Sequence, residues 1–288
     1  MKTLLPHALI GAALALSCAA PALAGLVNDV PSCYAANHFT FQSAAPDKLI
    51  YVLIDQTVQI DPTLQQSVIS NINRMLGPQT KFVVAEFSAF SQGRYLNVLN
   101  TGIIEAPLTQ DESGNVPMSQ LPNFHSCMNG QAQFSVALAD KAATGAMQGA
   151  TSALDQSDIM SALQNVSSAI KADPAKEKVL FLVTDGLENS SVTSFYAHHV
   201  VKKIDPATEL QKAKSANLIG DFGGAKVFVL GAGTLASAKN GTKTARDGYR
   251  DPVTLNRLKE FWEGYFKDSN ANLVEFGEPA LVEPTSFQ

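Results

Sequence analysis

The chain has 288 residues, of which 45% are hydrophobic and 16% charged, and its formal net charge at pH 7 is −5. A chain of this length and apolar content can bury a sizeable core. Its balance is mildly acidic and it has no stripe of clustered Lys and Arg, so nucleic acid is not an expected partner.

The first residues are typical of a secretory signal peptide. Lys2 gives a short basic start, an apolar run follows from Ala8 to Ala20, and Ala22-Leu23-Ala24 resembles a cleavage site. The run is short for a bilayer-spanning helix and no later stretch is long and apolar enough, so no membrane span is expected after cleavage. We predict a signal peptide over residues 1–24 and a periplasmic or secreted mature protein. The alternatives are a retained N-terminal anchor and a lipoprotein acylated on Cys18.

Two cysteines, Cys33 and Cys127, remain once the signal peptide is removed. An even pair in an oxidising compartment predicts a disulfide bond, and two buried free thiols are the alternative. The bond would tie an N-terminal arm, residues 25–46, to a distant part of the chain. In the chain-entropy model, closing so long a loop contributes about 4 to 5 kcal/mol as an upper figure.

After the arm, strand-like and helix-like segments alternate. Lys48–Ile54 is a near-continuous apolar run, typical of a strand buried on both faces. Asp61-Pro62 opens a helix and Gly77-Pro78 stops it. A second buried strand follows at Lys81–Phe87. A third, Tyr95–Ile104, is more polar and alternating, which favours a place at the edge of the sheet.

The middle of the chain begins with an irregular stretch. Pro107 to Pro122 is rich in Pro, Ser, Gly, Asn and Asp, which predicts a loop or hairpin excursion at about residues 107–130. The Ala-rich segment Gln131–Gln148 predicts a helix, and Asp158–Lys171 predicts another with one apolar face. Val179–Thr184 is the fourth strand and again a continuous apolar run.

The last third repeats the alternation. Asp185-Gly186 breaks the fourth strand, and Asp205-Pro206 opens the next helix. A fifth strand is predicted at Lys226–Leu230. Asp251-Pro252 then opens a helix with a broad aromatic face, and Leu273–Phe276 is a final short strand.

This order of elements predicts an α/β fold with a doubly wound, mainly parallel six-stranded sheet that has helices on both faces. One edge strand is expected to be antiparallel. We expect one domain over residues 47–278 and an irregular tail at 279–288. Ligands of such sheets bind outside the carboxyl ends of the strands. The residues just after Lys48–Ile54 and Val179–Thr184 therefore matter most.

The residues at those two strand ends resemble the metal-ion-dependent adhesion site of von Willebrand factor A (vWA) domains. Asp55-Gln56-Thr57-Val58-Gln59 follows the first strand, and Thr184-Asp185-Gly186 ends the fourth. These stand where the family has D-x-S-x-S and T-D-G, and the order of elements agrees from Asp47 to Glu278. The resemblance implies a domain that holds Mg²⁺ or Mn²⁺, with an acidic group of a partner often completing the metal's shell.

The family's ligands carry over residue by residue. Asp55 matches the first Asp, Thr57 the first Ser, and Asp185 the distant Asp. Ser157, just before a predicted helix, is the best match for the family's loop Thr, although it could be only a helix N-cap. Gln59 stands where the second Ser belongs, and its amide oxygen can ligate such an ion only if the longer side chain folds back.

The resemblance implies a module that binds a protein partner through a divalent metal. A scaffold that binds without metal, through its loops, and a component of an envelope assembly are alternatives within the same fold. Glu188 and Asn189 lie in the loop after the fourth strand and are expected to be rim residues rather than ligands.

Two enzyme alternatives also come from the residues. Gly231–Ala236 (GAGTLA) fits the dinucleotide fingerprint, but the acid about twenty residues on, Asp251, opens a helix instead of ending a strand. Asp55 at a strand end resembles the nucleophile of haloacid-dehalogenase phosphatases. Their acid, two residues later, is replaced here by Thr57. We therefore expect a binding protein and not an enzyme.

Overall fold

The computed structural model describes residues 28–88, 96–151, 156–197, 200–234 and 251–287. The predicted signal peptide, with Cys18 in it, lies outside the described residues. The strands are β1 (Lys48–Asp55), β2 (Thr80–Phe87), β3 (Asn97–Ile104), β4 (Glu177–Val183), β5 (Tyr196–Ala197), β6 (Val200–Val201), β7 (Ala225–Leu230) and β8 (Ala271–Phe276). The helices are α1 (Cys33–Ala36), α2 (Pro62–Met75), α3 (Gln110–Gly114), α4 (Leu121–Gly149), α5 (Ile159–Ala172), α6 (Pro206–Ser215) and α8 (Pro252–Asp268).

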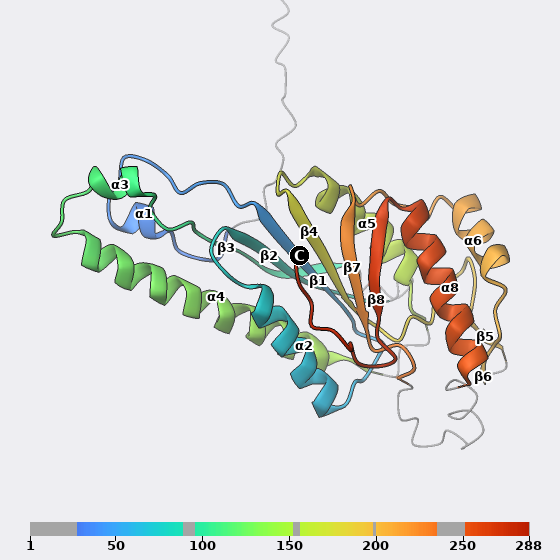
Figure 1. Ribbon diagram of the computed structural model, residues 1–288. Helices are drawn as coiled ribbons and strands as arrows, with labels where there is room; N and C mark the ends of the chain where they lie inside the picture. The colour runs from blue at the N-terminus through green and yellow to red at the C-terminus, as the bar shows by residue number, and fades with distance from the viewer. Residues whose placement is uncertain (1–27, 89–95, 152–155, 198–199, 235–250, 288) are drawn as a thin grey trace, which may run out of the picture.

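Six strands form one twisted sheet in the order β3-β2-β1-β4-β7-β8, with helices on both faces (Figure 1). All neighbours are parallel except β3, which runs antiparallel to β2 at the edge. The predicted α/β fold and the edge position of the third strand are confirmed. Counting only the strands of this sheet, the order is the 3-2-1-4-5-6 of doubly wound sheets, in which a crevice forms where the strand order reverses.

The core is divided by the sheet into two layers. Alternate side chains of β1 belong to different layers: Leu53 packs with α5 and α8, and Ile54 packs with α2 and α4. Because β1 is covered on both faces, its sequence is a continuous apolar run and does not alternate. The same holds for β4.

Each of the three Asp-Pro pairs that were predicted to open a helix does begin one. The side chains of Asp61, Asp205 and Asp251 accept hydrogen bonds from backbone N–H groups of the first turns of α2, α6 and α8. Proline fits the first turn because its missing N–H would have had no partner within the helix.

The stretch from Pro107 to Pro122 is not the predicted loop or hairpin. It contains α3, which begins with a capping box between Thr109 and Glu112, and α4 already starts at Leu121. Pro122 lies in the first turn of α4, where proline is tolerated. The helix predicted from Gln131 therefore begins ten residues earlier.

The early part of α4 belongs to a small second core beyond the edge of the sheet (Figure 1). Tyr34 of α1 packs edge-on against Phe124 of α4, with ring centroids 5.1 Å apart, and Phe39 and Phe41 stack beside them. A disulfide bond joins Cys33 to Cys127, whose Cα atoms lie 5.7 Å apart. We call α1, residues 37–43, α3 and the amino-terminal half of α4 the disulfide lobe.

A buried carboxylate connects this lobe to the sheet. Glu105, directly after β3, accepts hydrogen bonds from the Cys33 N–H at 2.7 Å and from Gln131 Nε2 at 2.9 Å. Ser32 Oγ donates to its other oxygen. Three donors thus satisfy one buried charge and fix α1 and α4 against the end of β3.

The tail has no helix or strand between residues 277 and 287, as predicted, but it packs back onto the domain (Figure 1, dark red). Its Thr285 hydrogen-bonds Asn71 of α2, and the Phe287 carbonyl accepts from Lys226 Nζ at 2.7 Å. Leu281 and Phe287 contact the core layer under α2 and α4. None of the helices in the described part of the chain combines the length and apolar character that a membrane span requires.

Candidate metal-ion site at the carboxyl edge of the sheet

The ends of two neighbouring parallel strands bring the central residues together. The register pairs Ile54 of β1 with Val183 of β4, which sets the next residues, Asp55 and Thr184, side by side. Both are buried, with 1% of Asp55 and none of Thr184 exposed. The parallel sheet thus places residues 129 positions apart in sequence at one edge.

Three hydroxyl groups from three segments converge on the Asp55 carboxylate. Its Oδ1 accepts from the N–H and from Oγ1 of Thr57, at 2.9 and 2.6 Å, which closes an Asx turn directly after the strand. Its Oδ2 accepts from Thr184 Oγ1 at 2.7 Å and from Ser157 Oγ at 3.1 Å. Both oxygens of this buried acid are therefore held in place.

Ser157 is positioned by backbone hydrogen bonds and not as a helix cap. Its N–H donates to the Asn189 carbonyl at 3.0 Å, and the Asn189 N–H donates back at 2.9 Å. The N-cap of α5 is Asp158, whose side chain makes no capping bond. The Glu188 carboxylate instead accepts from the Met160 N–H of the first turn, at 2.9 Å.

Asp185 lies two residues after the end of β4 and, like Asp55, begins an Asx turn. Its Oδ1 accepts from the Leu187 N–H at 2.9 Å, a second Asx turn. The residue between them, Gly186, has a φ of +76°, which glycine adopts without strain. The Gly186 carbonyl accepts from Trp262 Nε1 of α8 at 2.9 Å, which anchors the turn to the helix layer.

The two acids share a region of negative potential. Burial raises the pKa of Asp55, although its hydrogen bonds from Thr57, Thr184 and Ser157 act in the opposite direction. Burial also raises the pKa of Asp185 well above its ordinary value, and the neighbouring charge of Asp55 raises it further. The pKa of Tyr196 is raised by burial and then by the charges of Asp185 and Asp55, which places this tyrosine near the pair.

Gln59 does not join the other four sequence-predicted residues. Val58 and Ile60 on either side of it are buried in the core, so Gln59 points outward and is exposed. Its Nε2 donates to the Ala150 carbonyl, just after α4, at 3.1 Å. Within the described residues no hydrogen bond connects it to Asp55. The structure therefore brings together Asp55, Thr57, Ser157 and Asp185 only.

Three neighbours of the site escape the pattern in the sequence. Thr184 belongs to the T-D-G motif. Because the strands that precede Asp55 and Thr184 are parallel neighbours, their register could have identified Thr184 as part of the site. Glu188, expected at the rim, is fully buried because it caps α5. For Tyr196, which comes from a two-residue strand, the sequence carries no signal.

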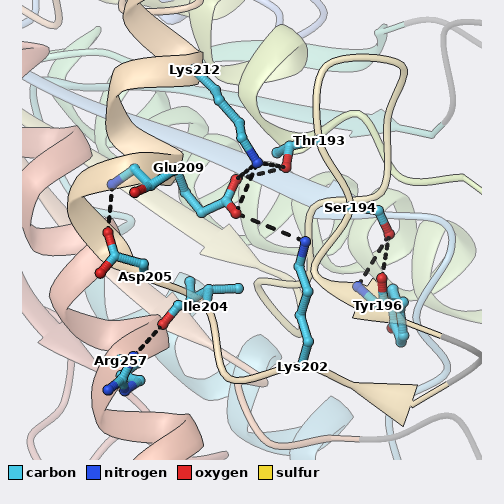
Figure 2. Close-up of polar contacts among 10 residues, drawn as sticks. Thr193, Ser194, Tyr196, Lys202, Ile204, Asp205, Glu209, Lys212 and Arg257 are labelled. Atoms are coloured by element: carbon cyan, nitrogen blue, oxygen red, sulfur yellow. Dashed lines mark hydrogen bonds and ion pairs between the residues drawn. The ribbon is translucent and has the colours of Figure 1, made fainter.

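The segment that carries Tyr196 is anchored to α6 by a buried acid (Figure 2). Glu209, 4% exposed, accepts from Thr193 Oγ1 at 2.6 Å and pairs with Lys212 at 3.0 Å. Lys202 lies farther from it, at 3.8 Å. A carboxylate this deeply buried is stable only when donors surround it, so the cluster keeps the segment against the helix.

The glycines of the dinucleotide fingerprint have a packing role here. Gly231 has a φ of +115°, and a Cβ at this position would lie 2.7 Å from the Thr184 carbonyl oxygen. Its N–H donates to the Pro279 carbonyl at 2.8 Å and so is not directed at a ligand. Leu235 and Ala236, the end of the fingerprint, lie outside the described residues.

The donor set at the edge fits a hard divalent cation. Among the described residues no group of three or more His, Cys, Asp or Glu side chains is placed to hold a metal ion. The candidate site depends on two carboxylates and three hydroxyls, the oxygen ligands that Mg²⁺ and Mn²⁺ prefer. Each hydroxyl donates its proton to Asp55 and keeps lone pairs with which it can ligate a cation.

No protein-family model matches this chain, and no curated protein matches its sequence. Among solved structures, an aerotolerance-related membrane protein from Bacteroides fragilis is 12% identical, covering 79% of this chain and 90% of that one, with a TM-score of 0.32. The pilus adhesin SpaC from Lactobacillus rhamnosus GG is 13% identical, covering 80% of this chain and 30% of the adhesin, with a TM-score of 0.34. BatB, a conserved hypothetical protein from Bacteroides thetaiotaomicron, is 12% identical, covering 80% and 89%, with a TM-score of 0.33. At such identities and TM-scores, nothing about function carries over to this chain.

Proposed function

We propose that this protein is an exported vWA-type binding module that grips an acidic group of a protein partner through Mg²⁺ or Mn²⁺. The observation that carries the proposal is the convergence of the Thr57, Ser157 and Thr184 hydroxyls on the buried carboxylate of Asp55, with Asp185 beside it. The predicted signal peptide supports export to the periplasm or the medium.

A divalent cation would relieve the main electrostatic cost of this arrangement. Two buried carboxylates repel each other, which is why the charge of Asp55 raises the pKa of Asp185. A cation held by Asp55, Asp185 and the neighbouring hydroxyls would stabilise both charges. Because hydroxyl ligands add no negative charge, the bound metal would keep enough positive charge to attract a carboxylate from outside.

The first test is metal-dependent stability. Mg²⁺ or Mn²⁺ at about one hundred times its dissociation constant should raise the free energy of unfolding by about 2.7 kcal/mol, with EDTA as the reference state. Asp55→Asn should abolish this response, because the amide keeps the Asx turn and removes the charge. The matched control is Asp61→Asn, the same change at the exposed N-cap of α2, which should leave the response intact. No response in the wild type, or an equal response in both variants, would contradict the metal site.

The second test is partner capture. Wild-type, Asp55→Asn and Asp61→Asn proteins are used as bait in an envelope extract, each with Mg²⁺ or with EDTA. The proposal expects a band that is lost with EDTA and lost with Asp55→Asn but retained with Asp61→Asn. Equal recovery under all conditions would support a metal-free scaffold that binds through its loops, and the metal-bridged mechanism would have to be abandoned.

A further inference from the structure

A groove of about 600 Å³ lies between α4 and strands β2 and β3, and Asp55 is not among its lining residues. Three small residues of α4 line it, Ala142, Gly145 and Ala146, and longer side chains at these positions would occupy part of the space. Leu99 of β3 and Leu138 of α4 complete an apolar wall.

A carboxylate interrupts the apolar row on this face of β2. Phe82 and Val84 are buried in the core layer under α4, and the next side chain on the same face is Glu86, which lines the groove. Its carboxylate accepts hydrogen bonds from Gln56 Nε2 at 2.6 Å and from Asn97 Nδ2 at 3.2 Å. Both donors are neutral amides, and among the described residues no ion pair compensates the negative charge of Glu86.

The other charged side chains of the groove do not neutralise Glu86. Asp29, from the N-terminal arm, is a second acid and accepts from the Thr101 N–H at 2.9 Å. Lys141 of α4 is the basic residue of the lining. In the described part of the chain it forms no ion pair with either acid. The lining therefore has a net negative charge.

The lining also contains a buried hydrogen-bond acceptor, which favours a ligand that carries donors. Asn100 of β3 is 6% exposed, and its Nδ2 donates to the Leu138 carbonyl at 2.9 Å. Its Oδ1 is buried without a hydrogen-bond partner. Buried polar atoms are rarely left unsatisfied, so this oxygen calls for a donor from outside the chain.

We propose that the groove binds an arginine side chain of a polypeptide partner. A guanidinium group carries a permanent positive charge and five donors, which suit the acceptors of Glu86, Asp29 and Asn100. Its aliphatic stem suits the wall formed by Leu99 and Ala142. The groove is a separate recognition point, and Gln56, which follows Asp55 and donates to Glu86, connects it to the metal-ion site. It does not depend on the metal.

The test uses N-acetyl-L-arginine amide as the probe, titrated into ¹⁵N-labelled full-length mature protein in EDTA. The expected result is saturable shifts of the backbone amides of Leu99, Asn100 and Gly145. N-acetyl-L-norleucine amide, with a similar stem and no charge, should give no saturable shift. Absence of saturation with the arginine probe, or equal shifts with both probes, would overturn the proposal.

Two variants and two controls locate the binding. Glu86→Gln should lower the affinity for the probe about tenfold, which corresponds to the loss of one charge-assisted hydrogen bond. Ala142→Leu should fill the groove and remove binding while every charge stays. Glu177→Gln, at an exposed glutamate at the start of β4, should bind the probe like the wild type. Unchanged affinity in Glu86→Gln or Ala142→Leu would contradict the site. Asp55→Asn should bind the probe normally, so a failure of the metal-ion site would not be mistaken for a failure of this one.

Discussion

The carboxyl edge of the sheet and the disulfide lobe are held together by different means. At the edge, Asp55 and Asp185 are placed by a parallel register between buried strands, and each is fixed by an Asx turn of its own. In the lobe, short helices depend on a few aromatic contacts and on a disulfide whose ends are 94 residues apart. The edge draws its rigidity from the main core. Substitutions at the edge should change metal binding more than the free energy of unfolding. Substitutions in the lobe should change the free energy of unfolding more than metal binding.

The largest expected effect comes from removing the disulfide. Cys33→Ser combined with Cys127→Ser should lower the free energy of unfolding by about 4 kcal/mol, because the unfolded chain gains freedom and the lobe's own core is small. Urea denaturation measures the loss, and the intact mass of the wild type before and after reduction checks the bond. The stabilisation by Mg²⁺ should survive in the double variant. Its disappearance would show that the two regions are coupled.

The next largest effect is predicted for Gly231, which touches the edge itself. Gly231→Ala should lower the free energy of unfolding by about 3 kcal/mol. The new Cβ would clash with the Thr184 carbonyl, and the backbone conformation at this position disfavours any side chain. Gly224→Ala is the matched control, with a φ of +81° and open space around the position, and should cost about 1 kcal/mol. Gly231→Ala should also weaken the response to Mg²⁺, because it displaces Thr184. Equal losses in the two variants would mean that the close approach does not matter.

The buried carboxyl group of Glu188 should make the free energy of unfolding depend on pH, and this dependence arises at the carboxyl edge and not in the disulfide lobe. Burial raises its pKa from 4.5 to about 8. The folded state therefore holds a proton that the unfolded state releases, and stability should fall as the pH rises from about 4.5 through about 8. Glu188→Gln should reduce the difference in unfolding free energy between pH 5 and pH 8 by roughly 3 kcal/mol. An unchanged pH profile in the variant would assign the dependence to other groups.

The smallest effect is expected at the ion pairs that hold the Tyr196 segment (Figure 2). Lys202 is a third exposed and its Nζ lies 3.8 Å from Glu209, so Lys202→Gln should cost about 0.3 kcal/mol. Lys212→Gln should cost about 1 kcal/mol, because Lys212 contacts both Glu209 and Thr193. Thermal unfolding can rank the two variants. A larger loss in Lys202→Gln would mean that the segment is anchored differently.

The sequence predicts the edge better than the lobe for a physical reason. Apolar runs and Asp-Pro pairs are local signals, and parallel strands bring residues such as Asp55 and Asp185 to one edge by topology alone. The lobe comes from contacts between distant segments, so the start of α4 at Leu121 and the packing of Phe124 have no local signature. Gln59 was placed by its spacing in a motif. The buried neighbours Val58 and Ile60 decide its direction instead.

The way the N-terminal arm meets β3 bears on self-association. The Thr101 N–H is taken by the Asp29 side chain, and the Ile103 N–H by the Asn28 side chain, at 2.9 and 3.1 Å. A side-chain acceptor ends the ladder, since it offers no strand for another chain to join. Proteolytic trimming that removed these two residues would uncover the outer hydrogen-bonding groups of this strand. The trimmed protein should then be the form that precipitates or fibrillises first on storage.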